Sequence, residues 1–276
     1  MSDPSTNLRR RRLSFLRRRR RSERAAAMTV IEHLRELRRR LIFSLGAFVV
    51  ISVVAFFFFE PILNALLQPL CNLDPDLLGP QGCRLSGFGP AEPFVVRLKV
   101  TAMVGVVCSA PVWLYQVWAF VTPGLTPQEK KYALPFILSS VVLFSIGVTF
   151  AYLTLEPGLR FLIGLGEGLI TPFYRADTYL NFVGLMFIGF GVAFELPLLL
   201  FFLGLAGVVS VDQLRKQRRA AFVAIAAIAA VVTPSQDPYT MLLMALPLYL
   251  LYELTILLLK LVARRRKKAG IPGAPV

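Results

Sequence analysis

Long apolar runs alternate with short polar links along most of this chain. Six runs are dominated by apolar residues, at positions 41–59, about 100–121, 133–155, 180–205, 220–232 and 241–259. A helix needs roughly 20 residues to cross a hydrocarbon core of about 30 Å, so the first four runs are long enough to span a membrane. The run at 220–232 covers only about 20 Å as a helix. The pattern predicts an all-α integral membrane protein with six transmembrane helices, in which the fifth and sixth form a short hairpin; a re-entrant fifth segment is the alternative.

Composition supports a membrane protein and excludes a soluble domain. Hydrophobic residues make up 56% of the 276 residues and charged residues 17%. The net charge of +15 would suggest nucleic acid binding on a soluble surface, but here the basic residues flank the apolar runs. With the N-terminus inside, 26 of the 31 Lys and Arg residues fall in cytoplasmic segments. We therefore expect a multi-pass protein of the cell membrane with both termini in the cytoplasm.

Both ends of the chain are rich in arginine or lysine. Residues 1–28 contain two arginine blocks, and we interpret them as a disordered cytoplasmic tail that contacts anionic lipid rather than nucleic acid. Translation from Met28 instead of Met1 fits the sequence equally well. The membrane domain is expected at 29–260, followed by a second basic tail at 261–276. Residues 11–16 resemble an export signal but lack an apolar core behind them.

The outer loops contain most of the remaining polar sequence. The loop at 60–93 is rich in Pro and Gly and is expected to form a structured cap over the outer helix ends. Cys71 and Cys83 both lie in it, and an oxidising exterior favours a disulfide between them, which would contribute about 3 kcal/mol in the chain-entropy model. Cys108 lies in the second run. The apolar stretch 159–165 in the next outer loop predicts a short interfacial helix.

Three capping boxes mark helix starts on the cytoplasmic side: Thr29 to Glu32, Thr126 to Glu129 and Ser210 to Gln213. The second lies in the polar hinge between the second and third runs, where Glu129 is either a helix cap or a receptor carboxylate. The first opens a juxtamembrane helix over 31–41 whose apolar residues recur at helical spacing, so that it can lie along the interface.

Acidic residues are rare on this basic face. The six are Asp3, Glu23, Glu32, Glu36, Glu129 and Asp212. A strongly positive face repels cations, so a basic ligand must be captured by carboxylates of matching geometry. Glu36 and Glu129 both stand at inner ends of spans, where they would form a two-carboxylate site for paired guanidinium groups. For Glu36, an ordinary surface ion pair with Arg40 is the alternative.

Two further acids occupy unusual positions. Glu195 lies within the fourth run beside Pro197, and a carboxylate at that depth costs about 2.5 kcal/mol or more, so we expect a functional role, with a buried structural hydrogen bond as the alternative. Asp237 lies in the link between the last two runs, where a turn is the simpler interpretation. A proton-coupled secondary transporter with Glu195 as its ion site remains an alternative function, although the two halves of the chain show no repeat.

Enzymatic function is disfavoured by the same inventory. His33 is the only histidine and precedes the first span, which argues against an intramembrane protease with a histidine base. No zinc constellation and no nucleotide-binding loop can be assembled, so we expect no metal and no cofactor.

Four segments resemble the TatC family, the polytopic receptor of the twin-arginine protein translocase: residues 33–41 (HLRELRRRL), 111–136 (PVWLYQVWAFVTPGLTPQEKKYALPF), 190–197 (FGVAFELP) and 245–253 (ALPLYLLYE). The resemblance covers about 29–260. It implies a cup-like bundle that binds twin-arginine signal peptides, assembles with TatA-type and TatB-type single-span subunits and with further copies of itself, and exports folded proteins by the proton-motive force.

The resemblance also implies roles for particular residues. Glu36 and Glu129 would contact the arginine pair, and the site would be shaped by Arg38, Gln116 and Phe120. Glu195 would lie in the concave membrane-embedded face, and the fifth and sixth helices would dock partners. The family commonly has Thr-Pro-Pro-Asp where this chain has 233–237 (TPSQD), so no firm role passes to Asp237.

Overall fold

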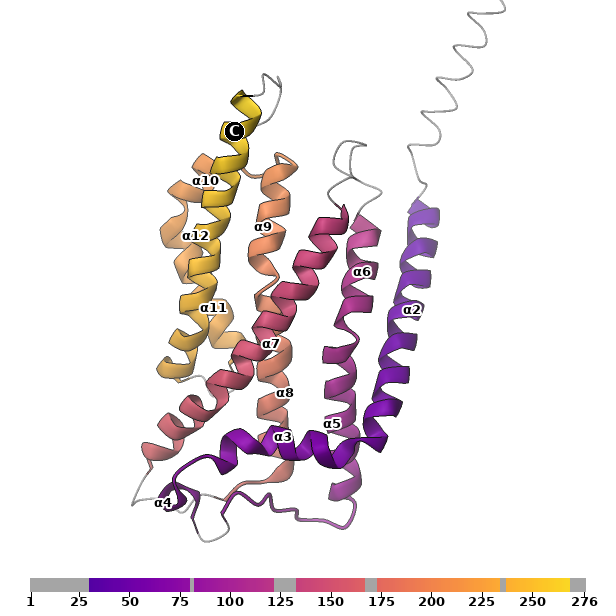
Figure 1. Cartoon of the computed structure of the whole chain (residues 1–276), viewed down its shortest axis with the longest axis vertical. Helices are drawn as coiled ribbons and strands as arrows, with labels where there is room; N and C mark the ends of the chain where they lie inside the picture. The colour runs from indigo at the N-terminus through magenta and orange to yellow at the C-terminus, as the bar shows by residue number, and fades with distance from the viewer. Residues whose placement is uncertain (1–29, 80–81, 122–132, 167–172, 234–236, 269–276) are drawn as a thin grey trace, which may run out of the picture.

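The fold is a bundle of helices, seen in a computed structural model that describes residues 30–79, 82–121, 133–166, 173–233 and 237–268. Within these ranges the β-type pairing is a single isolated bridge between Ser86 and Arg175. Figure 1 shows the long helices side by side, with α3 lying across one end of the bundle. The helices are α2 (Val30–Phe57), α3 (Phe59–Cys71), α4 (Pro75–Leu78), α5 (Glu92–Cys108), α6 (Ala110–Val121), α7 (Ala133–Gly164), α8 (Ala176–Ala193), α9 (Leu196–Leu205), α10 (Val211–Lys216), α11 (Arg218–Val232) and α12 (Pro238–Lys268).

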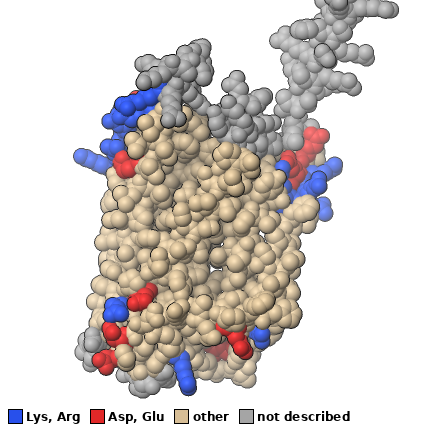
Figure 2. Space-filling view, in the orientation of Figure 1, with Lys and Arg blue, Asp and Glu red and all other residues tan. Residues whose placement is uncertain are grey.

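Charged side chains gather at the two ends of the bundle and leave a broad uncharged band between them (Figure 2). The start of α2, helix α10 and the end of α12 lie at one end, which we call the basic end, while α3 and α4 lie at the other, the cap end (Figure 1). An uncharged band between charged ends is the surface that a bilayer requires. The protein is therefore a multi-pass membrane protein.

Four helical segments of the described chain are long and apolar enough to cross a membrane: Ile31–Phe57, Leu134–Gly164, Ala176–Leu205 and Pro238–Arg264. Helices α5 and α6 make a fifth if they are counted as one bent span, with an angle of 50° between them. The bend follows from Pro111, which has no N–H to donate to the preceding turn. Trp113 Nε1 donates to the Val106 carbonyl at 3.1 Å and Ser109 Oγ donates to it at 3.2 Å, so this carbonyl is satisfied beside the bend.

The loop that follows the first span contains a helix, α3, that forms the expected cap. Pro61 cannot donate to the preceding turn, and the chain turns at Phe58 from α2 into α3. At this corner Arg97 Nη2 donates to the Phe56 carbonyl at 3.1 Å, and the guanidinium lies 4.4 Å from the centre of the Phe56 ring. Arg97 thus fixes the corner from α5.

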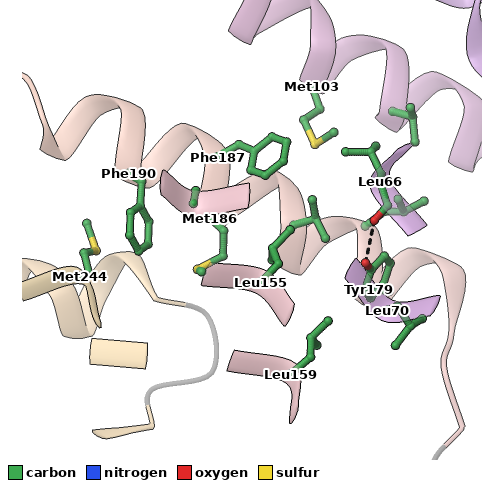
Figure 3. Packing of buried hydrophobic residues seen from close by; sticks show 14 of the residues in the cluster. Leu66, Leu70, Met103, Leu155, Leu159, Tyr179, Met186, Phe187, Phe190 and Met244 are labelled. Atoms are coloured by element: carbon green, nitrogen blue, oxygen red, sulfur yellow. Dashed lines mark hydrogen bonds between the residues drawn. The ribbon is translucent and has the colours of Figure 1, made fainter. Parts of the chain in front are cut away.

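The largest buried cluster joins this cap to the spanning helices. Leu66 and Leu70 of α3 pack with Leu155 of α7 and Met186 of α8 (Figure 3). The Tyr179 hydroxyl donates to the Leu66 carbonyl at 2.8 Å, the dashed line in Figure 3. The cap is further tied to α7 by an ion pair between Arg160 and Asp74 with an N–O distance of 2.7 Å.

Two of the three cysteines form the disulfide that the sequence predicts. Cys71, the last residue of α3, is joined to Cys83 in a disulfide with a Cα–Cα distance of 4.9 Å. Cys108 is free. The disulfide closes the loop that follows α3 and so holds α4 near the cap.

Two expectations about helix length are corrected. The last helix is not short, because α12 runs for 31 residues. Asp237 and Pro238 start it earlier than the apolar run, and the basic segment continues it to Lys268, past the expected domain limit at 260. The stretch 159–165 does not form a separate interfacial helix, since α7 continues unbroken to Gly164. Helix α11, with 15 residues, is short as expected.

Of the three predicted capping boxes, the one at Ser210 is confirmed. Gln213 N donates to Ser210 Oγ at 3.1 Å and Ser210 N donates to Gln213 Oε1 at 2.9 Å, which together start α10. The boxes at Thr29 and Thr126 lie outside the described residues.

Candidate functional site

The candidate site lies at the basic end, where α2 and α6 run side by side (Figure 1). Arg40 of α2 joins the two helices. Its Nε donates to Glu36 Oε1 at 3.0 Å, its Nη2 also contacts this oxygen, and its Nη1 donates to Gln116 Oε1 of α6 at 3.2 Å. One guanidinium therefore binds both the carboxylate of Glu36 on α2 and the amide of Gln116 on α6. These two residues lie 80 positions apart in the chain.

The two oxygens of Glu36 differ in their surroundings. Oε1 accepts from Arg40, whereas Oε2 is buried and has no hydrogen-bond partner among the described residues. The side chains of Glu36 and Arg40 are only 21% and 22% exposed, so this pair is not the ordinary exposed pair considered above. A buried carboxylate oxygen without a donor is costly, and it is a ready acceptor for a ligand N–H group.

An aromatic contact lies beside this carboxylate, nearer the start of α2. The His33 ring, one turn before Glu36 on α2, stacks on the Phe120 ring of α6 with 4.2 Å between centroids and 19° between planes. Arg38 is exposed on α2. The structure therefore brings Glu36, Gln116 and Phe120 to one place, with Arg38 on the adjoining surface.

Glu129, the second expected carboxylate, lies outside the described residues. The pairing of Glu36 with Glu129 therefore stays a prediction. The described chain fixes only the positions from which the hinge departs and returns, the end of α6 at Val121 and the start of α7 at Ala133, and Figure 1 shows both at the basic end.

Glu195 lies at the break between α8 and α9. The break arises because Pro197 has no N–H for the carbonyl four residues earlier. Ser140 Oγ of α7 donates to Glu195 Oε2 at 2.7 Å, while Oε1 is buried without a partner among the described residues. The structural hydrogen bond considered from the sequence is thus present for one oxygen, and the other oxygen is unused.

Asp237 caps a helix. Its Oδ1 accepts from the Thr240 amide at 2.8 Å, and its Oδ2 accepts from the Thr240 hydroxyl. The carboxylate thereby satisfies a free N–H in the first turn of α12, where Pro238 occupies the first helical position. This capping role accounts for the buried carboxylate of Asp237, and no ligand needs to be invoked for it.

Two members of the site were not predicted as such. The sequence pattern pairs Arg40 only with Glu36, and it assigns His33 no role in a binding site. The bridge from Arg40 to Gln116 joins distant parts of the chain, so no local pattern contains it. Phe120 is expected to shape the site from the family resemblance, but the sequence does not indicate that the His33 ring stacks on it.

Within the described ranges, no group of three or more His, Cys, Asp or Glu residues is arranged to hold a metal ion. The side chains that the structure brings together at the basic end are suited to recognition by charge and hydrogen bonding. A partly buried carboxylate with one open oxygen, an amide and an aromatic wall suit a ligand that carries guanidinium groups.

Comparison with known proteins identifies close relatives. The family model described as "Sec-independent protein translocase protein (TatC)" matches residues 32–247. The TatC protein of Frankia casuarinae is 44% identical over 249 residues, which cover 88% of this chain and 68% of the relative. The TatC protein of Aquifex aeolicus is 40% identical over 244 residues, covering 87% of this chain and 98% of the relative.

Solved structures give the same result. A crystal structure described as the twin arginine translocase receptor TatC superposes with a TM-score of 0.71 at 39% sequence identity. The match covers 84% of this chain and 100% of that one. A second crystal structure of such a receptor, determined in a detergent, also gives a TM-score of 0.71, at 40% identity.

Proposed function

The chain belongs to the TatC family of Sec-independent protein translocase proteins, and from this premise we propose that it is the receptor for twin-arginine signal peptides, with its site at the basic end of α2 and α6. The observation that carries the proposal is the Glu36 carboxylate on a basic face, because one of its oxygens is buried and has no hydrogen-bond donor among the described residues. A translocase subunit of this family is not an enzyme, and its task is to recognise cargo and to assemble the export complex.

Two carboxylates receive the two guanidinium groups in this proposal. Glu36 takes one of them, and Glu129, in the hinge between α6 and α7, takes the other. Gln116 and Phe120 shape the floor and wall, while Arg38 sets the charge of the rim. Paired bidentate contacts between guanidinium and carboxylate groups provide both affinity and geometric selection.

The basic end faces the cytoplasm in our proposal. The excess of Lys and Arg there agrees with the positive-inside rule, and both termini of the described chain lie at that end (Figure 1). Six crossings result if the bent pair of α5 and α6 counts as one span and short α11 as another. A 15-residue span would thin the bilayer beside it, which lowers the barrier for a large cargo.

Assembly with other subunits is the second half of the proposed function. Helix α2 packs against α5 and α6, but only 6% of its apolar segment is buried, so its other side is open to lipid or to neighbouring subunits. We place TatA-type and TatB-type single-span partners against α11 and α12, and further copies of this chain in the receptor complex. The Glu195 carboxylate, whose Oε1 is buried without a donor among the described residues, is assigned to this assembly as well. The basic tails contact anionic lipid, and the proton-motive force supplies the energy.

An export assay tests this function. In cells that lack their own TatC and carry this chain with its partner subunits, a folded fluorescent reporter with a twin-arginine signal is expected to reach the outside. We expect Glu36→Gln and Glu129→Ala to abolish export, because each leaves one arginine without its carboxylate. Glu32→Gln removes the same charge one turn earlier on α2 and serves as the matched control. Normal export by both the Glu36 and the Glu129 variant would contradict the receptor proposal.

A further inference from the structure

The Glu36 site already contains a guanidinium group, that of Arg40. Two of its nitrogens contact Glu36 Oε1 and a third donates to Gln116 Oε1, so its N–H groups are directed at the acceptors that the site offers. With Arg40 in place, the Glu36 charge is neutralised inside a face that also contains Arg35, Arg38 and Arg39. An incoming cation therefore does not meet a free carboxylate.

This arrangement treats the two basic side chains of peptides differently. A second guanidinium can replace Arg40 with little loss, because it brings the same planar set of donors to Glu36 and Gln116. A lysine ammonium is a compact, strongly hydrated charge that cannot reproduce the bridge between a carboxylate on α2 and an amide on α6. The neutral pair also removes most of the long-range attraction that would otherwise capture any cation.

We infer that Arg40 is a resident guanidinium that occupies the Glu36 site until an arginine of the signal peptide replaces it, and that this exchange makes the site select arginine over lysine. Glu36 Oε2, which is buried and has no donor among the described residues, gains a donor when the exchange is complete. As the peptide guanidinium takes over Oε1 and Gln116, Arg40 moves out to the cytoplasmic solvent. The inference rests on the proposed receptor function and assigns a specificity-determining role to Arg40.

The test compares twin-arginine and twin-lysine signal peptides on the full-length protein in nanodiscs. For Arg40→Gln we expect the twin-lysine peptide to bind about ten-fold more tightly than it binds wild type, while the affinity for the twin-arginine peptide stays about the same. The ratio of the two affinities then falls by about ten-fold. Arg40→Lys keeps a cation between α2 and α6 but not the planar donors, so its ratio should lie between those of wild type and Arg40→Gln.

Arg39→Gln is the matched control for charge. Arg39 is exposed on the same turn and its guanidinium lies 5.7 Å from the centre of the Phe43 ring, so its removal lowers the charge of the face without changing the contacts that Arg40 makes and should leave the ratio unchanged. An unchanged ratio in both Arg40 variants would overturn the inference, as would a loss of twin-arginine binding in Arg40→Gln as large as that in Glu36→Gln. The inference alone fails if Glu36→Gln loses binding but the Arg40 variants do not change the ratio. If Glu36→Gln binds like wild type, both the receptor site and the inference fail.

Discussion

Gly147→Ala is expected to destabilise the protein by about 2 kcal/mol, through overpacking against backbone that cannot move aside. A Cβ atom at Gly147 of α7 would lie 2.7 Å from the Phe190 carbonyl oxygen and 3.1 Å from the Gly191 Cα of α8. On the other side of the crossing, Gly191 of α8 leaves room for the Phe144 ring of α7. A Cβ atom added at Gly191 would lie 2.5 Å from that ring. Small residues at this crossing let the two backbones touch, as is common where membrane helices pack closely.

Thermal unfolding of the purified variant measures this effect, with an expected fall of several degrees in the midpoint. Gly164→Ala is the matched control, because Gly164 is in the same helix and a Cβ there would meet no atom within 4 Å. The control should keep the wild-type midpoint or exceed it slightly, since alanine favours the helix. Equal shifts in the two variants would contradict the close crossing of α7 and α8.

Glu195→Leu is expected to stabilise the protein by about 2 kcal/mol and at the same time to impair export. A carboxylate in the middle of a span costs about 2.5 to 3.5 kcal/mol, whereas leucine is slightly favourable there. Loss of the hydrogen bond from Ser140 reduces this gain in folding free energy by about 1 kcal/mol. A residue whose removal makes the fold more stable must serve another purpose, which we take to be a role in assembly with partner subunits.

Two measurements on each variant separate these effects: the unfolding midpoint in detergent and the rate of reporter export. Glu195→Gln is the control, because it keeps an acceptor for Ser140 Oγ and should retain more export than the leucine variant. If Glu195→Leu were less stable than wild type, the carboxylate would be a structural hydrogen-bond partner and no more. Full export by Glu195→Leu would likewise contradict the functional role.

The length of apolar runs was sufficient to predict most of the bundle. The first, third and fourth runs became α2, α7 and the pair α8 and α9, because about 20 apolar residues have few stable conformations other than a spanning helix. The second run is also helical, but Pro111 within it produces a bend between α5 and α6 that the length of the run does not predict. Capping chemistry predicted the start of α10 correctly, since both members of the Ser210 box lie within four residues of each other.

The errors came from the ends of the runs. Helix α3 follows directly after the first apolar run, and the Pro and Gly content of the loop concealed it. Its apolar residues Ile62, Leu66 and Leu70 recur every four positions, a signal that could have identified an amphipathic helix. The last helix was predicted too short because the end of an apolar run was equated with the end of a helix. Helix α12 instead continues into its basic segment, where arginine and lysine are good helix formers.

The candidate site was predictable only in part. The scarcity of acids on a basic face was enough to select Glu36, and the resemblance to the TatC family added Gln116 and Phe120. The bridge through Arg40 and the stacking of His33 on Phe120 depend on how α2 packs against α6, which is a property of the folded chain. For the same reason the buried oxygen of Glu36 that lacks a donor, on which the receptor proposal rests, is visible only in the structure.

Binding of a twin-arginine signal peptide to the purified protein in nanodiscs tests the central claim most directly. The comparison includes a twin-lysine peptide and the Glu129→Ala variant. Loss of a charge-assisted pair costs several kcal/mol, so we predict that both the lysine peptide on wild type and the arginine peptide on Glu129→Ala bind at least about 100-fold more weakly than the arginine peptide on wild type. Equal affinity in all three cases would contradict the account, because Glu129 would then be only a helix cap and the basic end would not be the receptor site.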